Sequence, residues 1–252
     1  MGWALLGLVL AALAGCVGVS PRGRGAASDQ AGGWAGARWI ADGRPQPTND
    51  AAFYADDPAP LFRKRFAVGK EVRSATLRIV GLGFYEAALN GETLNWGLLP
   101  PWTPFGQRVL YDTYDVTQTL RPGVNALSVE LGNGWYNPLP LRMWGRFNLR
   151  EALTVGRPCL IASLQITYAD GSRQTVVSDA SWRTAPGPIV RNSIYLGETC
   201  DARLDPEGWT QAEFDDSRWA SAAVASGPGG ALEPRRAPGV GVREAWPAVG
   251  VR

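Results

Sequence analysis

The sequence predicts an all-β protein, and three observations point to this class. Apolar and polar side chains alternate in segments 75–79 and 125–131, as in strands with one buried face. Asn90-Gly91 follows a strand-like run, and this pair suits a tight hairpin because both turn positions favour positive φ. The 252 residues include 31 glycines and 11 tryptophans but no convincing long helical pattern. This length is enough for one large β domain or two small ones.

Residues 1–15 are predicted to be a signal peptide, because 4–15 form an apolar run that is too short to span a bilayer. The segment Leu13-Ala14-Gly15-Cys16 resembles a bacterial lipobox, so we expect Cys16 to be lipidated and the exported chain to be anchored to a membrane. No Lys or Arg precedes the run, so the positively charged start that is typical of both kinds of export signal is missing. The alternatives to a lipoprotein signal are an ordinary signal of a secreted or periplasmic protein and a chance match. Residues 16–36 are rich in Gly, Ser and Ala and are predicted to be a flexible tether.

Residues 37–225 are predicted to form the folded β domain. Its first half contains the strand-like segments 37–40, 61–68, 75–79, 84–89, 108–117 and 125–131. The run Arg63-Lys64-Arg65 is expected to be a solvated strand face or a protected sheet edge, with binding of acidic sugars as a minor alternative.

The second half contains the longest alternation of period two, in 160–168. Asp170-Gly171 then turns the chain into 173–178 as a hairpin, and Trp182 begins a further short strand. Asp216-Ser217 is expected to cap one helical turn around 218–221. The Gly- and Pro-rich start of 226–252 predicts an exit linker, followed by the start of a next domain.

The composition limits the chemistry that the chain can perform. The sequence has no histidine, which excludes Ser-His-Asp and Cys-His catalysis and histidine metal sites. A net charge of +2 without long runs of like charge predicts no nucleic-acid partner. Oxygen ligands for hard cations such as calcium remain available.

The acidic and sulfur-containing residues offer few catalytic groups. Glycoside hydrolysis needs two facing carboxylates, and the sequence offers Glu198 with Asp201 and Asp215 with Asp216. We expect the first two to form an ion-pair cluster with Arg203, and the second two to act as turn caps. Two further residues, Cys159 and Cys200, form either a disulfide or two free thiols.

Several aromatic side chains lie beside asparagines in predicted loops and at strand ends. Aromatic faces stack on the C–H groups of sugars, and amides hydrogen-bond sugar hydroxyls. Core packing explains any single tryptophan equally well, but the clustering favours sugar recognition. The group consists of Trp96, Trp102, Trp135, Tyr136 and Trp144, with Asn90, Asn95, Asn133 and Asn137.

The order of several sequence blocks resembles the N-terminal β-sandwich module of bacterial α-L-rhamnosidases, glycoside hydrolase family 78. The blocks are FYEAALNG, PPWTPF, RVLYDTYDVT, GVNALSVELGNGWYN, SIYLGETCDARLDPEGW and FDDSRW. The resemblance covers about residues 38–252 and implies a jelly-roll, galactose-binding-like β-sandwich. It does not include the helical barrel that carries the family's catalytic acid and base, so it implies no catalytic residues in this chain.

Some of these modules are similar to carbohydrate-binding module family 67, which binds L-rhamnose through a calcium ion. There, an Asn and a Pro five residues apart act with acidic or amide side chains near the first hairpin. Asn133 and Pro138 match the Asn–Pro spacing, and Asn90 falls near the first pair, although Gly91 follows it in place of an acidic residue. The resemblance therefore implies a calcium site at Asn90, Asn133 and Pro138.

The expected sugar site contains Asn90, Trp102, Asn133, Trp135, Pro138 and Trp144. The resemblance implies an accessory module that binds carbohydrate or acts as a scaffold in rhamnoside degradation. Its implied partners are L-rhamnose or a rhamnose-containing glycan and a catalytic helical-barrel domain. Two alternatives are the front fragment of a truncated or split rhamnosidase that is active only with its barrel, and a structural remnant without ligand.

Overall fold

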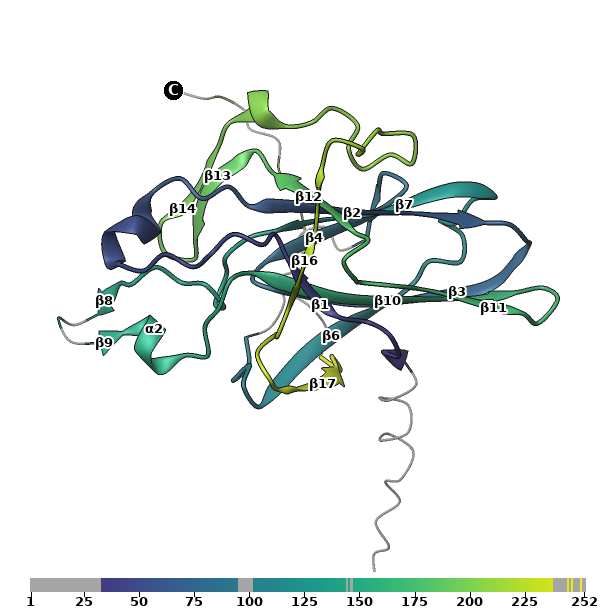
Figure 1. Ribbon diagram of the computed structural model, residues 1–252. Coiled ribbons are helices and arrows are strands. Elements are labelled where there is room, and N and C mark those ends of the chain that lie inside the picture. The colour runs from purple at the N-terminus through teal and green to yellow at the C-terminus, as the bar shows by residue number, and fades with distance from the viewer. Residues whose placement is uncertain are drawn as a thin grey trace, which may run out of the picture.

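The computed structural model describes residues 33–94, 102–143, 145, 147–237, 244, 246 and 250. In this part of the chain, nearly all regular structure is β-strand, and most strands belong to two sheets that face each other (Figure 1). The expected all-β jelly-roll sandwich is therefore confirmed. Within the same residues, no helix has the length and apolar character needed to cross a membrane.

The first sheet has the strand order β16-β1-β10-β3-β6-β17, and β11 pairs with β10 beside this path. Its strands are β1 (Trp39–Ala41), β3 (Val72–Leu82), β6 (Arg108–Asp115), β10 (Cys159–Tyr168), β11 (Arg173–Val177), β16 (Ala223–Ala225) and β17 (Ala231–Pro234). The neighbours β3 and β10 are antiparallel over almost their whole length, from the pair Cys159 and Leu82 to the pair Thr167 and Ser74. This long pairing makes β3 and β10 the centre of the sheet.

The second sheet has the order β15-β12-β2-β7-β4-β5. Its strands are β2 (Pro60–Val68), β4 (Tyr85–Leu89), β5 (Glu92–Thr93), β7 (Gly123–Leu131), β12 (Arg183–Pro186) and β15 (Ala220–Ser221). The predicted turn between β4 and β5 is present, with φ of 54° at Asn90 and 84° at Gly91. Both values are positive, as the sequence pair predicts.

Smaller elements gather at one end of the sandwich, at the left in Figure 1. They are the 3-10 helix η1 (Asp50–Tyr54), the hairpin of β8 (Arg142–Met143) and β9 (Phe147–Asn148), the short helix α2 (Leu149–Ala152), and the hairpin of β13 (Ile189–Ser193) and β14 (Gly197–Cys200). The 3-10 helix η2 (Ala202–Leu204) follows β14. These elements lie in the connections between sheet strands, and their short strands pair with each other instead of joining the two main sheets.

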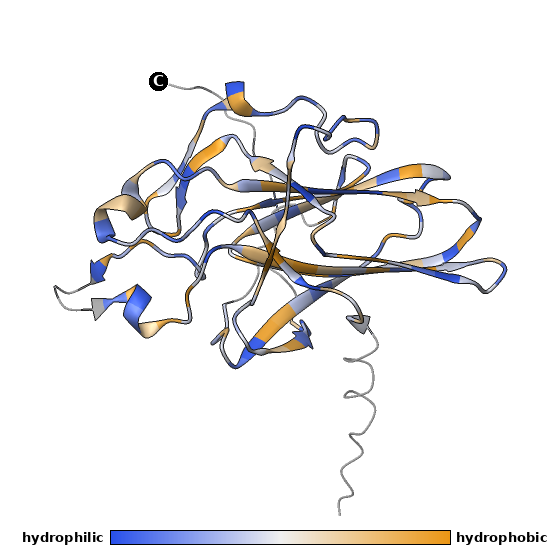
Figure 2. Cartoon of the chain, viewed as in Figure 1, coloured by the Kyte–Doolittle hydropathy of each residue, from blue (hydrophilic) through white to orange (hydrophobic). Residues whose placement is uncertain are grey.

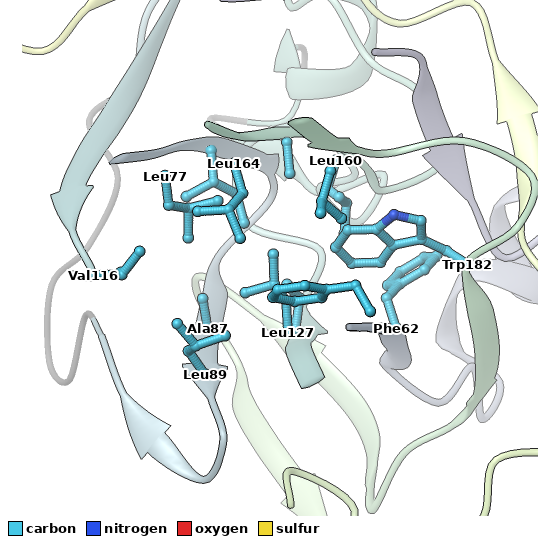
Figure 3. Packing of buried hydrophobic residues seen from close by; sticks show 14 of the residues in the cluster. Phe62, Leu77, Ala87, Leu89, Val116, Leu127, Leu160, Leu164 and Trp182 are labelled. Atoms are coloured by element: carbon cyan, nitrogen blue, oxygen red, sulfur yellow. The ribbon is translucent and has the colours of Figure 1, made fainter. Parts of the chain in front are cut away.

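The main core fills the space between the sheets. Figure 3 shows Leu77, Leu160 and Leu164 of the first sheet pointing toward Phe62 and Leu127 of the second. Trp182 closes one side and is fully buried, with its indole N–H donating to the Val177 carbonyl at 2.9 Å. Apolar residues are concentrated along these central strands, as the orange segments of Figure 2 show. Burial of each such side chain stabilises the fold by roughly 2 kcal/mol.

A second cluster covers the outer face of the first sheet. The strand alternation sends Val80 and Leu82 of β3 and Ile161 of β10 to this face, where Phe105 and Tyr136 cover them. Both faces of this half of β10 are therefore buried, which explains its long apolar run.

Arg63 does not lie on a solvated face or at a sheet edge, so that prediction is wrong for this residue. β2 is an inner strand between β12 and β7, and Arg63 is fully buried. Its guanidinium forms an ion pair with Asp216 and donates to the carbonyl oxygens of Trp209 and Gln211. The neighbouring Arg65 is exposed, as predicted.

Two further expectations differ from the structure. Residues 217–219 form a turn that leads into β15 instead of a helical turn, because Asp216 is engaged by Arg63, and Asp215 accepts the hydrogen bond from the Ser217 amide. The sandwich also extends beyond 37–225. Trp34 packs edge-on against Tyr111 with ring centroids 5.1 Å apart, and β17 pairs in parallel with β6.

Candidate functional site

Three segments that are distant in sequence converge at the end of the sandwich that carries η1 and the β13–β14 hairpin (Figure 1). They enclose a pocket of about 180 Å³. Its walls come from η1 and its flanks, from the loop after β7, and from the hairpin of β13 and β14. We call this cavity the end pocket.

Close packing of backbones fixes the loop after β7. A Cβ atom on Gly83 would lie 1.8 Å from the Gly132 carbonyl oxygen, and one on Gly134 would lie 2.7 Å from the Gly83 carbonyl carbon. Gly83 and Gly134 both have positive φ, at 125° and 47°. Only glycine fits this contact, so the Asn133-Gly134 pair re-aims the chain at the end of β7 as the sequence predicts.

Three asparagines form the polar side of the end pocket. The backbone N–H of Asn133 donates to Asn192 Oδ1 at 2.6 Å, and the side-chain Nδ2 of Asn133 donates to the backbone carbonyl of Asn192 at 3.1 Å. Asn137 Nδ2 donates to Asn133 Oδ1 at 2.7 Å. Asn192 Nδ2 is buried and has no hydrogen-bond partner among the described residues. This wall therefore contains one amide donor that the described residues leave unsatisfied.

Apolar side chains also line the end pocket. Leu196 lines the end pocket although 64% of its surface is exposed, and Phe53 and Leu139 line it beside the asparagines. The adjacent Tyr195 stacks edge-on with Trp135, with ring centroids 5.9 Å apart. The combination of apolar surface with a few fixed polar groups is typical of sites for small ligands.

A network of ion pairs holds the η1 wall in place. Arg157 binds both Asp57, at 2.6 Å, and Asp42, at 2.8 Å, and Arg44 binds the same two carboxylates. Burial opposes the charge of Asp42, but hydrogen bonds from Arg157 and Arg44 outweigh it and lower the pKa of this carboxyl. Asp57 lines the end pocket, so the network joins that wall to the residues before β10.

The predicted sugar-binding residues are distributed over more than one location. Asn133 lines the end pocket, and Pro138 is buried in the same loop. Trp135 and Trp102 come together at a separate cavity of about 10 Å³, which is too small for a sugar, and Trp102 is 46% exposed. Trp144 and the predicted lipidation site Cys16 lie outside the described residues.

Asn90 lies at the other end of β7 from Asn133. Its backbone amide donates to the Ala126 carbonyl near the start of the strand, whereas Asn133 follows the end of the strand. Its side chain donates to the Thr119 carbonyl and to Asn125 Oδ1 and accepts from the Ala126 amide. Asn90 therefore stabilises the hairpin, and the predicted calcium site cannot combine it with Asn133 and Pro138.

The remaining donors do not fit calcium either. Arg150 Nη1 donates to the Pro138 carbonyl at 2.7 Å, so a cation already occupies one side of this oxygen. The described residues contain no group of three or more carboxylate, thiol or imidazole side chains placed to bind one metal ion. Calcium sites usually include several carboxylate oxygens.

The other candidate groups have structural surroundings. Asp201 caps η2 and pairs with Arg203 at 2.6 Å on the surface, and hydrogen bonds from Arg203 lower the pKa of Asp201. Cys159 is buried and Cys200 is exposed, and both are free thiols. Burial raises the pKa of Cys159 to about 12, so this thiol is unreactive at neutral pH.

Sequence reasoning missed Asn192, Leu196 and the η1 wall of the end pocket. Segment 189–200 is mostly exposed and shows no clean alternation of apolar residues, so the β13–β14 hairpin carried no strand signal. The block SIYLGETC was visible as part of a family resemblance, and this was the one signal that marked the hairpin.

The fold and the end pocket define a β-sandwich module that presents a ligand-sized cavity in its end loops. Residues 70–244 match the family model described as the α-L-rhamnosidase N-terminal domain. This match covers more than half of the chain, and the chain therefore belongs to that family.

Known proteins agree with this assignment. An α-L-rhamnosidase of Streptomyces avermitilis is 44% identical over 151 residues, which are 60% of this chain and 14% of that protein. A solved α-L-rhamnosidase of Dictyoglomus thermophilum has a TM-score of 0.68 at 37% identity, over 81% of this chain and 22% of the other. The solved Streptomyces avermitilis α-L-rhamnosidase complexed with L-rhamnose has a TM-score of 0.63 at 39% identity, over 69% and 17% of the two chains. The chain thus spans less than a quarter of the length of these relatives.

Proposed function

We propose that the chain is an accessory carbohydrate-binding module of an α-L-rhamnosidase, and that the end pocket holds a terminal L-rhamnosyl residue. The observation that carries the proposal is that the β13–β14 hairpin contributes to the end pocket both Asn192, whose Nδ2 donor has no partner among the described residues, and the exposed Leu196 side chain. L-Rhamnose is a 6-deoxy sugar with hydroxyls on the ring and one methyl group. It offers oxygen atoms to the asparagines and the methyl group to Leu196.

The expected affinity follows from the size of these contacts. Each hydrogen bond to the sugar contributes about 1 kcal/mol net, and burial of one methyl group contributes a similar amount. A few such contacts correspond to a Kd in roughly the micromolar to millimolar range. We therefore expect weak binding of the monosaccharide.

Calorimetry with L-rhamnose tests the proposal. Asn133→Ala and Leu196→Ala should each weaken binding by about tenfold, because each removes a side chain that lines the end pocket. Gln118→Ala is the control, since Gln118 is exposed and lies in the loop between β6 and β7, where that loop packs beside the β4–β5 hairpin at the other end of the sandwich. No heat at millimolar sugar in the wild type would contradict the proposal.

L-Mannose sharpens the test, because it differs from L-rhamnose in carrying a hydroxyl on carbon 6. The wild type should bind L-mannose more weakly than L-rhamnose, since the hydroxyl loses hydration against Leu196. This preference should disappear in Leu196→Ala. A preference that survives the substitution would place the methyl group elsewhere.

A scaffold role is the second candidate, and one observation favours it. β17 adds to the edge of the first sheet beside β6, and Arg235 Nη2 binds Asp112 Oδ1 at 2.5 Å with both side chains about 90% buried. The segment that leaves the sandwich is therefore fixed rather than loosely attached. A rigid exit would orient a following catalytic domain, and it requires no sugar in the end pocket.

A further inference from the structure

Arg150 lies behind the wall of the end pocket and joins two of its lining residues. Its amide is capped by Asn148 Oδ1 at 3.0 Å in the first turn of α2. Its guanidinium carbon lies 4.0 Å from the ring centroid of Phe53, and Nη1 donates to Asn137 Oδ1 at 2.9 Å and to the Pro138 carbonyl at 2.7 Å. The side chain is thus fixed by an aromatic face and two oxygen atoms.

These oxygens are of the amide and carbonyl types that calcium accepts as ligands. Asn133 Oδ1 is also engaged, because it accepts from Asn137 Nδ2 at 2.7 Å, and Asn137 Oδ1 accepts from Gln46 Nε2 at 3.0 Å as well. A divalent cation bound here would lie beside the guanidinium, and like charges at this distance repel. Arginine keeps its charge at all physiological pH values.

We propose that Arg150 supplies the positive charge that a metal ion would otherwise provide in this loop, so that ligand binding at the end pocket is independent of calcium. The inference rests on the proposed sugar site. Arg150 does not line the end pocket and acts through Phe53 and Asn137, which do. It is therefore a positioning residue for the 133–138 loop and the η1 wall.

The first experiment uses the metal alone. The thermal unfolding midpoint of the wild-type protein is measured in calcium chloride at up to 10 mM and in excess EGTA. We expect the two midpoints to agree within about 1 °C, whereas a calcium ion bound at 100 times its Kd would raise the midpoint by roughly 5 °C or more. Such a rise would overturn the proposal. Because no sugar is present, this result holds even if the end pocket binds no rhamnose.

The second experiment measures L-rhamnose binding in variants of Arg150. Arg150→Met keeps the contact with Phe53 but leaves the Pro138 carbonyl without this donor and Asn137 Oδ1 with Gln46 alone, and it should weaken binding by about tenfold. Arg150→Lys retains a charge and should stay within about threefold of the wild type. Arg142→Met is the matched control, since Arg142 is exposed in the neighbouring β8.

Three results would contradict the positioning role. These are unchanged binding by Arg150→Met, failure of Arg150→Lys to retain affinity while it stays folded, and loss of sugar binding by the wild type in EGTA. If Arg150→Met fails to fold, the lysine variant and the wild type in EGTA still decide. Absence of sugar heat in every condition would instead refute the proposed function, and the calcium measurement would still test Arg150.

Discussion

Glu130 is a partly buried carboxyl whose pKa is raised in the folded protein. It lies on β7 directly opposite Glu86 of β4, and its Oε1 atom is buried with no hydrogen-bond partner among the described residues. Burial, followed by the charges of Glu86, Asp205 and Glu198, raises the pKa of Glu130 from 4.5 to about 7. The folded protein therefore holds a proton here at a pH where the unfolded chain has lost it.

This shift predicts that stability falls as pH rises from 4.5 to 7, because the folded state binds more protons than the unfolded state in that window. Glu130→Gln removes the titration and should increase the free energy of unfolding at pH 8 by about 1–3 kcal/mol relative to the wild type. The difference should shrink toward pH 4.5. Urea unfolding across this pH range provides the measurement, with the exposed Glu92→Gln as control. A constant difference at all pH values would contradict the assignment.

Arg63 is a second residue whose surroundings predict a large effect. Arg63→Met would leave Asp216 and the Trp209 carbonyl without this partner, and the Gln211 carbonyl with the Phe214 backbone N–H alone. Removing one partner of a buried ion pair typically costs about 3–5 kcal/mol. Arg65→Met, with the same chemical change at an exposed position two residues away, should change stability by less than about 0.5 kcal/mol. Equal losses in denaturant unfolding of the two variants would refute the buried pairing.

These residues show where sequence reasoning ends. Nothing local distinguishes Arg63 from Arg65, because the partner Asp216 is 153 residues away in sequence. The Asn90-Gly91 turn was predicted correctly, since its backbone conformation depends on those two residues alone. The role of the Asn90 side chain was not predicted, because its partners Thr119 and Asn125 lie about 30 residues further along the chain, in the loop before β7 and in β7 itself.

At the level of elements, β7 connects the two ends of the sandwich. Its start holds the Asn90 hairpin, and its end delivers Asn133 to the end pocket. The contact of Gly83 with Gly132 fixes the direction in which the chain leaves the strand. The β3–β4 turn therefore controls the pocket although Gly83 does not line it.

Gly83→Ala tests this control. The new Cβ would meet the Gly132 oxygen at 1.8 Å, so the variant should lose more than about 3 kcal/mol of stability or displace the 132–134 loop and lose sugar binding. Gly123→Ala is the matched control, because Gly123 also has positive φ, at 88°, but its Cβ would meet nothing within 4 Å. It should cost only about 1–2 kcal/mol, from backbone strain. Calorimetry and urea unfolding measure both effects, and similar losses in the two variants would argue against the close contact.

The elements that sequence predicted well are those with a local signal. The alternation in 160–168 appears as β10, and Asp170-Gly171 turns it into β11 as expected. The β13–β14 hairpin and β17 were missed because their strands are short, contain no buried residue and show little apolar alternation. β17 in addition pairs with a strand more than 100 residues earlier, which no local pattern indicates.

At the scale of the whole molecule, the residues before β1 and the segment of β17 and Arg235 both belong to the packed sandwich. Trp34 and Leu232 pack against the second cluster on the outer face of the first sheet, and Arg235 neutralises the buried Asp112, which also accepts a hydrogen bond from Tyr85. The Gly- and Pro-rich composition of 226–238 led to a predicted boundary at 225, but residues 226–230 connect β16 to β17 within the sandwich. The family match to residue 244 is consistent with the later boundary.

Two truncated chains test this extent of the sandwich. A chain that ends at Ala225 loses β17 and leaves Asp112 without its cation, and it should be less stable than a chain that ends at Ala237 by about 2–5 kcal/mol. Arg235→Met in the longer chain should account for part of this loss, because it removes the ion pair and retains the strand. Urea unfolding of the three proteins provides the comparison. Equal stability of the two truncated chains would mean that β17 does not stabilise the sandwich. The proposed scaffold role would then lose its support, because it depends on a firmly attached β17.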